Sequence, residues 1–214
     1  PQHDSNTADS ALRAGNIRVS RDSKSGHSRH AVQPLVMRWF DQNTENEFAR
    51  LTEQFGVASI LTNRLQCIDF PARWCLLTIE NWESFYTLSY SCPAVPVLSV
   101  YLGGNASAVV LDALVALKPA PSAVLHFGDY DWAGLEIFSR LVTVLPQARL
   151  YVAPQLELLF QHYGNRALVT EQPFRGEHLE HPQCRVIVEH ISRFNAGVEQ
   201  EIVPPPAFTD FGIN

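Results

Sequence analysis

The chain has 214 residues, of which 46% are apolar, so it is long enough to bury the core of one domain or of one domain and a half. Its formal net charge of −6 argues against a protein that binds nucleic acid unaided, because contacts to phosphates need cations. No apolar run approaches the ~20 residues that cross a bilayer, and the N-terminal stretch PQHDSNTADSALRAGN lacks the layout of a secretory signal. We therefore expect a cytoplasmic protein without membrane contact. Because the first residue is proline, we also expect a fragment or a trimmed product, with a missing upstream domain as an open alternative.

Cysteine and histidine indicate neither a disulfide framework nor a zinc site. The four cysteines form no CxxC pair, and the eight histidines are scattered. His178 and His181 share the polar stretch GEHLEHPQ, where chance spacing is the preferred interpretation. We expect thiols in the core at Cys67, Cys75, Cys92 and Cys184.

Residues 1–30 are predicted to form a flexible polar and basic tail. They are rich in Ser, Asn, Asp and Arg and show almost no apolar periodicity. Residues 1–38 hold six basic residues against three acidic ones, so the rest of the chain has a net charge of −9. A solvated tail is the preferred interpretation, and an arm that touches DNA is the alternative.

Residues 31–70 are predicted to form a small helical subdomain or the remnant of an upstream domain. HAVQPLVMRWF has an apolar stripe, and VASILTNRLQ is a further helical run. Between them, NTENEFARLTEQFG places Thr44 and Glu47 at the spacing of a capping box and ends at Gly56. We expect no strand in this part of the chain.

Residues 71–204 alternate short apolar runs with longer helical patterns, which indicates βαβ units and a parallel sheet. Strands are predicted at WCLLTI, PVLSVYL, SAVLHF and ARLYVA, and helices at WESFYTLSY, NASAVVLDALVAL, WAGLEIFSRLVTVL, PQLELLFQHYG and PQCRVIVEHISRFNAG. The predicted fold is therefore α/β, a mainly parallel sheet of about four strands flanked by helices. Residues 205–214 are predicted to be a C-terminal tail.

Three acids are predicted to meet at one edge of this sheet. Asp129 and Asp131 follow the third predicted strand and Glu80 ends the first. Gly103 and Gly104 follow the second strand, where they would let backbone approach closely. Because the carboxyl ends of parallel strands share an edge, we expect these residues to lie together.

Such a cluster needs a cation or a proton. Two carboxylates ~4 Å apart repel by roughly 4 kcal/mol at an effective dielectric near 20. With oxygen ligands alone, Mg²⁺ or Mn²⁺ is the expected ion, and either suits phosphodiester chemistry. The alternative is that Asp131 only caps the helix that begins at WAGLEIF.

The motifs just described resemble the Toprim domain of topoisomerases, bacterial primases and several nucleases. That family has a Glu after its first strand and a DxD after its third, which match Glu80, Asp129 and Asp131. GDYDWAGLEIF is similar to the signature of the topoisomerase VI A subunit and Spo11 group. The resemblance extends to the C-terminal domain of JetD-like proteins, the nuclease subunits of Wadjet plasmid-defence systems, through TIENWESF and GVEQEIVPP. It covers roughly residues 72–204 and implies a Toprim-like (Rossmann-like) fold.

The resemblance also implies roles for single residues. Asp129 and Asp131 would hold a divalent metal, and Glu80 would be a further ligand or the general acid/base. Glu199 and Glu201 would complete a second metal site, or they are solvated acids. The implied activity is Mg²⁺-dependent DNA cleavage, with DNA and an SMC-type ATPase complex as partners and a homodimer as an open alternative. Asn81 would orient Glu80 or, preferably, cap the next helix.

Topoisomerases of this group use a nucleophilic tyrosine from a separate domain, and residues 31–67 contain no tyrosine. Hydrolysis by water is thus the simpler mechanism, while transesterification with a missing domain stays open. Tyr130 is expected to pack beside the sheet or to face solvent, and His126 to be buried beside the site.

Two other functions are weighed. Haloacid-dehalogenase-type phosphatases also place DxD after a strand, but Trp132 and Ala133 follow here in place of the usual Thr or Val, and Lys118 is the last lysine. A non-catalytic Toprim-like scaffold that binds proteins or DNA is the third reading of the same acids.

Overall fold

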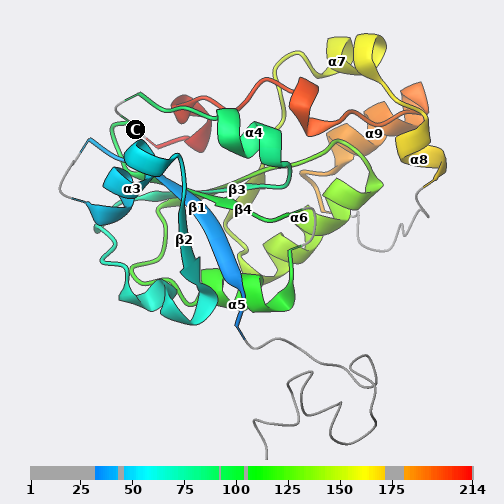
Figure 1. Ribbon diagram of the computed structural model, residues 1–214. Helices are drawn as coiled ribbons and strands as arrows, with labels where there is room; N and C mark the ends of the chain where they lie inside the picture. The colour runs from blue at the N-terminus through cyan, green and yellow to red at the C-terminus, as the bar shows by residue number, and fades with distance from the viewer. Residues whose placement is uncertain (1–31, 43–45, 92, 104–105, 172–180, 214) are drawn as a thin grey trace, which may run out of the picture.

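The structure is a computed structural model that describes residues 32–42, 46–91, 93–103, 106–171 and 181–213 (Figure 1). The predicted tail over residues 1–30 lies outside these ranges, as do Thr44, Cys92, Gly104 and His178. Within the described part of the chain, no helix combines the length and the apolar character needed to cross a bilayer.

The described residues form one mixed sheet of six strands in the order β2-β1-β4-β3-β5-β6. The strands are β1 (Pro34–Phe40), β2 (Ala58–Leu61), β3 (Cys75–Ile79), β4 (Val97–Tyr101), β5 (Ala123–Phe127) and β6 (Ala148–Leu150). The pairs β3–β4, β3–β5 and β5–β6 are parallel, whereas β1 pairs antiparallel with both β2 and β4. The predicted α/β fold with a mainly parallel sheet is confirmed, and two antiparallel strands extend the four predicted ones.

Helices cover both faces of the sheet. They are α3 (Glu47–Phe55), α4 (Trp82–Thr87), α5 (Ala108–Val115), α6 (Trp132–Val144), α7 (Leu156–Tyr163), α8 (Ala167–Thr170) and α9 (Arg185–Phe194), with 3₁₀ turns at η1 (Thr62–Cys67), η3 (Gln200–Ile202) and η4 (Phe208–Phe211). Helices α5 and α6 contact each other and lie on the opposite side of the strands from α4 (Figure 1). This is the arrangement that right-handed crossovers between parallel strands produce.

The prediction of a helical subdomain over residues 31–70 is wrong in its first and last parts. Residues 34–40 form a strand in which Leu35, Met37 and Trp39 alternate along one buried face. Met37 and Trp39 pair with β4, and Leu35 pairs with β2. VASILTNRLQ forms β2 and η1. Both strands belong to the same sheet as the later ones, because burial against β4 outweighs any helical preference of the local sequence.

Helix α3 is where the sequence predicts it, but its cap differs. The side chain of Asn46 accepts hydrogen bonds from the N–H groups of Phe48 and Ala49, so Asn46 is the N-cap. Gly56 ends the helix with a left-handed backbone at φ 81°, as predicted.

The central strands of the sheet lie in the core, which keeps the edge at which they end rigid. Every residue of β3 is buried, which is why CLLTI is apolar apart from Thr78 and does not alternate. Trp39, Phe70 and Trp74 pack as one aromatic cluster, with ring centroids of Phe70 and Trp74 4.4 Å apart. Burial of each such ring stabilises the fold by about 1.5–3 kcal/mol.

Two smaller expectations need correction. Cys75 and Cys184 are buried thiols as predicted, but Cys67 is exposed because η1 ends at the surface. The predicted C-terminal tail is docked over residues 205–213: Phe211 is buried, and the hydroxyl of Tyr90 donates to the carbonyl oxygen of Pro206. Apolar side chains in this segment give it a place on the core.

Candidate metal centre

The carboxyl ends of β3 and β5 lie side by side. The strands pair in parallel with Ile79 opposite Phe127, and the N–H of Glu80 donates to the carbonyl oxygen of Phe127 at 3.3 Å. Glu80 and residues 128–131 therefore leave the sheet next to each other, where the sequence predicts a shared edge.

Strand β4 ends at the same edge. The N–H of Leu102 donates to the carbonyl oxygen of Ile79 at 2.8 Å, so Gly103 follows close to the end of β3. Gly103 has φ 63°, a left-handed conformation that glycine adopts without strain.

Glu80 is fixed by a buried chain of polar groups. Its carboxylate is only 4% exposed, and its Oε1 atom lies 2.8 Å from Nε2 of His126, which is fully buried. The Nδ1 atom of His126 lies 2.9 Å from the hydroxyl of Thr78. In the tautomer with hydrogen on Nε2, His126 donates to Glu80 and its Nδ1 accepts from Thr78, which leaves neither ring nitrogen unpaired. His126 is thus beside the site, as the sequence analysis expects, and it orients Glu80.

Gly128 is required by this pair. A Cβ atom at position 128 would overlap Oε1 of Glu80 and would lie 2.8 Å from Nε2 of His126. Any other residue would push the two side chains apart, so the glycine before the DxD motif makes room for the Glu80 carboxylate.

Asp129 is half-buried, and its pKa is raised above the ordinary value for an aspartate. Its Oδ1 atom accepts a hydrogen bond of 2.7 Å from the backbone N–H of Gln200. Burial raises the pKa of Asp129 to about 7, and the negative charge of Glu80 adds to this effect. Asp131 and Glu201 also raise the pKa, and only the Gln200 hydrogen bond opposes them. The carboxylates therefore lie close enough to repel one another.

Asp131 is 3% exposed and caps helix α6. Its Oδ1 atom accepts a hydrogen bond of 2.8 Å from the N–H of Gly134. A Cβ atom at Gly134 would overlap the carbonyl oxygen of Asp129, so this glycine lets the helix begin directly beneath the DxD turn. Asp131 therefore has the capping role of the alternative interpretation, while its role as a metal ligand stays a prediction.

Glu199 and Glu201 differ in their surroundings, although both are exposed. Glu201 accepts a hydrogen bond from the side-chain amide of Asn81, and its negative charge raises the pKa of Asp129. Glu199 precedes η3 and shares neither contact. Asn81 caps α4 by accepting hydrogen bonds from Glu83 and Ser84, which was the preferred expectation for it.

Gln200 is a residue of this edge that the sequence does not predict. Its side chain is fully buried, and its Oε1 atom accepts a hydrogen bond of 2.9 Å from the N–H of Asn81. The only sign of its role in the sequence is that a neutral residue stands between two acids in VEQEI.

Tyr130 does not face solvent. It is fully buried; its hydroxyl donates to the carbonyl oxygen of Tyr151 at 3.2 Å and accepts from the N–H of Ala153 at 2.9 Å. Its backbone forms an antiparallel bridge with Val198, which ties the C-terminal segment to the DxD turn. The packing expectation for Tyr130 is confirmed.

Comparison with known protein families matches residues 33–204 to the family described as Wadjet protein JetD, C-terminal. The chain belongs to this family. The match covers most of the 214 residues and includes β1 and β2 as well as the acidic edge. No curated protein matches the chain.

Each of the three acids at the strand ends has a hydrogen-bond partner within the chain. Within the described ranges, no three His, Cys, Asp or Glu side chains lie so that they could bind one metal ion without moving. The reason is geometric: Glu80 is turned to His126, Asp129 to Gln200 and Asp131 to Gly134.

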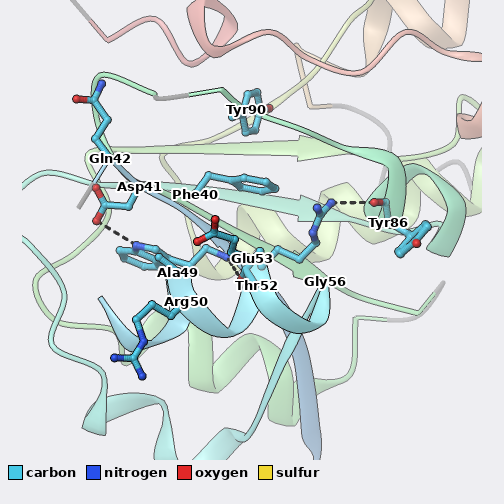
Figure 2. Close-up of a pocket in the computed structure, with 12 residues that line it drawn as sticks. Phe40, Asp41, Gln42, Ala49, Arg50, Thr52, Glu53, Gly56, Tyr86 and Tyr90 are labelled. Carbon is cyan, nitrogen blue, oxygen red and sulfur yellow. Dashed lines mark hydrogen bonds between the residues drawn. The ribbon is translucent and has the colours of Figure 1, made fainter. Parts of the chain in front are cut away.

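A separate hollow lies on the face of this JetD C-terminal chain that α3 and α4 flank. It has a volume of about 760 Å³, and Phe40, Arg50, Glu53, Tyr86 and Tyr90 are among the residues that line it (Figure 2). None of the five acids considered above lines this hollow. The candidate metal centre therefore depends on the carboxylates at the strand ends and not on the hollow beside α3.

Proposed function

We propose that the chain is the Mg²⁺-dependent DNA nuclease module, of the Toprim type, of a Wadjet defence complex. The observation that supports this most is the meeting of Glu80 and Asp129 at the joined ends of β3 and β5, where burial and like charge raise the pKa of Asp129 to about 7. Membership of the JetD C-terminal family supports the role as a Wadjet subunit.

The donor set fits a hard divalent cation. Carboxylate oxygens are the ligands that Mg²⁺ and Mn²⁺ prefer, and Asp129 lies within electrostatic range of Glu80, Asp131 and Glu201. Glu80 uses Oε1 for His126 and Asp129 uses Oδ1 for Gln200, so in this proposal their second oxygens are the ones that bind the cation. Among the described residues, Gln200 Nε2 is a buried polar atom without a hydrogen-bond partner, which is a further sign of a site built for a polar ligand.

In this proposal Asp129 and Asp131 hold the cation, and Glu80 is a further ligand or the general acid/base. A bound Mg²⁺ polarises phosphoryl oxygens and lowers the pKa of a water. His126 keeps Glu80 in one orientation, and Gly128 lets the carboxylate approach the DxD turn. Glu201 adds negative charge at the rim, whereas Glu199 is assigned to solvent.

Because the chain is acidic, we propose that partner subunits bring the DNA to it. The formal net charge of −6 repels a polyanion, so an SMC-type ATPase complex or a further domain supplies the cations. The proposal therefore includes a multi-subunit assembly as the active form.

The test is cleavage of supercoiled plasmid with Mg²⁺ or Mn²⁺, with partner subunits present. Wild type should nick or linearise the plasmid, and Asp129→Ala should lose at least about a hundredfold of this activity, the scale seen when a transition-state contact is removed. Asp112→Asn, on the exposed side of α5, is the control and should cleave like wild type. Equal cleavage by wild type and Asp129→Ala would refute the proposal.

A non-catalytic scaffold is the second candidate. It is favoured by the use of Asp131 as the cap of α6 and by the burial of Glu80 against His126. A wild type that binds DNA ends or partners but never cleaves, with either metal, would support it. Release of phosphate from small phosphomonoesters would instead favour a phosphatase of the haloacid-dehalogenase type.

A further inference from the structure

Gln200 connects the two halves of the acidic edge. Its backbone N–H donates to Oδ1 of Asp129 at 2.7 Å, and its side-chain Oε1 accepts from the N–H of Asn81 at 2.9 Å. Asn81 is the residue after Glu80, so one glutamine contacts the chain just beyond both β3 and β5. Strand pairing between these two exits ends at Ile79 and Phe127, followed by the hydrogen bond from the Glu80 N–H to the Phe127 carbonyl oxygen.

Backbone hydrogen bonds fix the position of Gln200. The antiparallel bridge between Tyr130 and Val198 brings the C-terminal segment onto the DxD turn, with hydrogen bonds of 2.9 and 3.1 Å. The next residues enter η3, so that Gln200 points inward while Glu199 and Glu201 are exposed. The neutral middle residue is therefore the one in contact with the acids.

The remaining amide nitrogen of Gln200 is also informative. Nε2 is buried and has no hydrogen-bond partner within the described residues. A structural clamp would gain stability by pairing this donor, as Gln183 does when its Nε2 donates to the carbonyl oxygen of Ala148. Nε2 of Gln200 is instead left able to donate to an oxygen ligand.

We propose that Gln200 is the positioning residue of the metal centre, holding Asp129 beside the exit of β3 so that the two can supply ligands to one divalent cation. The inference rests on the proposed function, because it assigns a role within that site. It goes further than the proposed function by assigning the role of the VEQEI segment in the metal centre to Gln200 rather than to Glu199 and Glu201. Residues that orient metal ligands typically change metal affinity by 10–100-fold when they are replaced.

The experiment measures Mn²⁺ binding by calorimetry on the full chain without DNA, together with the melting temperature. Gln200→Met keeps the length of the side chain and removes the acceptor for Asn81, so it should weaken Mn²⁺ binding by about 10–100-fold. Gln183→Met is the matched control: Gln183 accepts from the N–H of Leu150 at 2.8 Å and clamps β6. That control should lower the melting temperature and leave Mn²⁺ affinity unchanged.

Gln200→Glu is the second variant and tests the site even if the methionine variant does not fold. Its oxygen can still accept from Asn81, while its charge adds a carboxylate beside Asp129. Without metal it should melt below wild type, and saturating Mn²⁺ should raise its melting temperature by more than that of wild type. An equal rise in both proteins would show that the side chain does not face the cation.

The outcomes separate the two proposals. If wild type binds no Mn²⁺, the proposed function fails and the role of Gln200 fails with it. If wild type binds Mn²⁺ and Gln200→Met binds equally well, only the role of Gln200 is overturned. A loss of affinity in Gln200→Met that Gln183→Met shares would mark a general loss of stability and would also overturn it.

Discussion

Nε2 of His126 lies 2.8 Å from Oε1 of Glu80, and both side chains are buried. The pair lies where β3 and β5 end side by side, and each of its two members has its own task. His126 supplies a hydrogen bond that the carboxylate cannot obtain from solvent. Glu80 supplies the negative charge at the edge of the sheet.

We expect these tasks to be separated by two substitutions. His126→Phe leaves a buried carboxylate without a donor and should destabilise the fold by about 3–5 kcal/mol. Glu80→Gln keeps an oxygen that accepts from Nε2, so it should cost no more than about 1.5 kcal/mol while abolishing plasmid cleavage. Urea unfolding of both variants checks this, and equal losses of stability would contradict it.

Asp129 should make the fold less stable as the pH rises. Its pKa is about 7 in the folded protein against an ordinary value of 3.8, so the folded state binds the extra proton between these values. Stability from this group is therefore complete below pH ~4 and is lost as the pH rises through ~7. Asp129→Asn has no proton to lose and should gain in melting temperature over wild type at pH 8 but not at pH 4.

Each kcal/mol corresponds to about 2–4 °C for a chain of this length, so scanning calorimetry at the two pH values resolves the effect. Asp112→Asn, on the exposed face of α5, is the control that should show no such difference. A constant gap between Asp129→Asn and wild type from pH 4 to pH 8 would rule out the raised pKa. Saturating Mg²⁺ should narrow the gap at pH 8 by stabilising wild type.

Gly128→Ala should impair the centre through one methyl group. The added Cβ overlaps Oε1 of Glu80, so the carboxylate or His126 has to move. We expect a loss of about 1–3 kcal/mol from overpacking and a fall of about 100-fold in cleavage, because a displacement near 1 Å costs that much.

Gly56→Ala is its control. It strains the left-handed turn at the end of α3, at φ 81°, and touches none of the acids. It should lower stability without changing the cleavage rate of the folded fraction. Normal cleavage by Gly128→Ala would mean that Glu80 has freedom that the structure does not show.

Tyr130→Phe distinguishes hydrolysis from attack by this tyrosine. The hydroxyl is used by Tyr151 and Ala153, so its removal should cost about 1–3 kcal/mol and leave two backbone groups unpaired. Cleavage should persist, and denaturing gels should show no protein attached to the DNA ends in either protein. A covalent adduct that the variant lacks would make Tyr130 a nucleophile.

The central strands were predictable from sequence because they are buried on both faces. WCLLTI, PVLSVYL and SAVLHF are mostly apolar runs, and each contains a strand of the structure. The acids that follow them are placed by the chain itself, so the nearness of Glu80 to Asp129 follows once the strands are parallel and adjacent.

The first strand was missed although its alternation is visible. Leu35, Met37 and Trp39 recur at every second position, but Val36 and Phe40 fill the gaps and imitate a helical stripe. Pairing with β2 and β4 decides between the two interpretations, and β4 lies about 60 residues further on. Gln200 was missed for a similar reason, because its contacts to Asp129 and Asn81 span 71 and 119 residues.

The bridge between Tyr130 and Val198 has a consequence for biosynthesis. A ribosome makes both carboxylate-bearing turns long before it reaches position 198, so a growing polypeptide has the acids without the segment that closes over them. The centre proposed here is thus finished late in translation, and a truncated product that stops short of that segment is born incomplete.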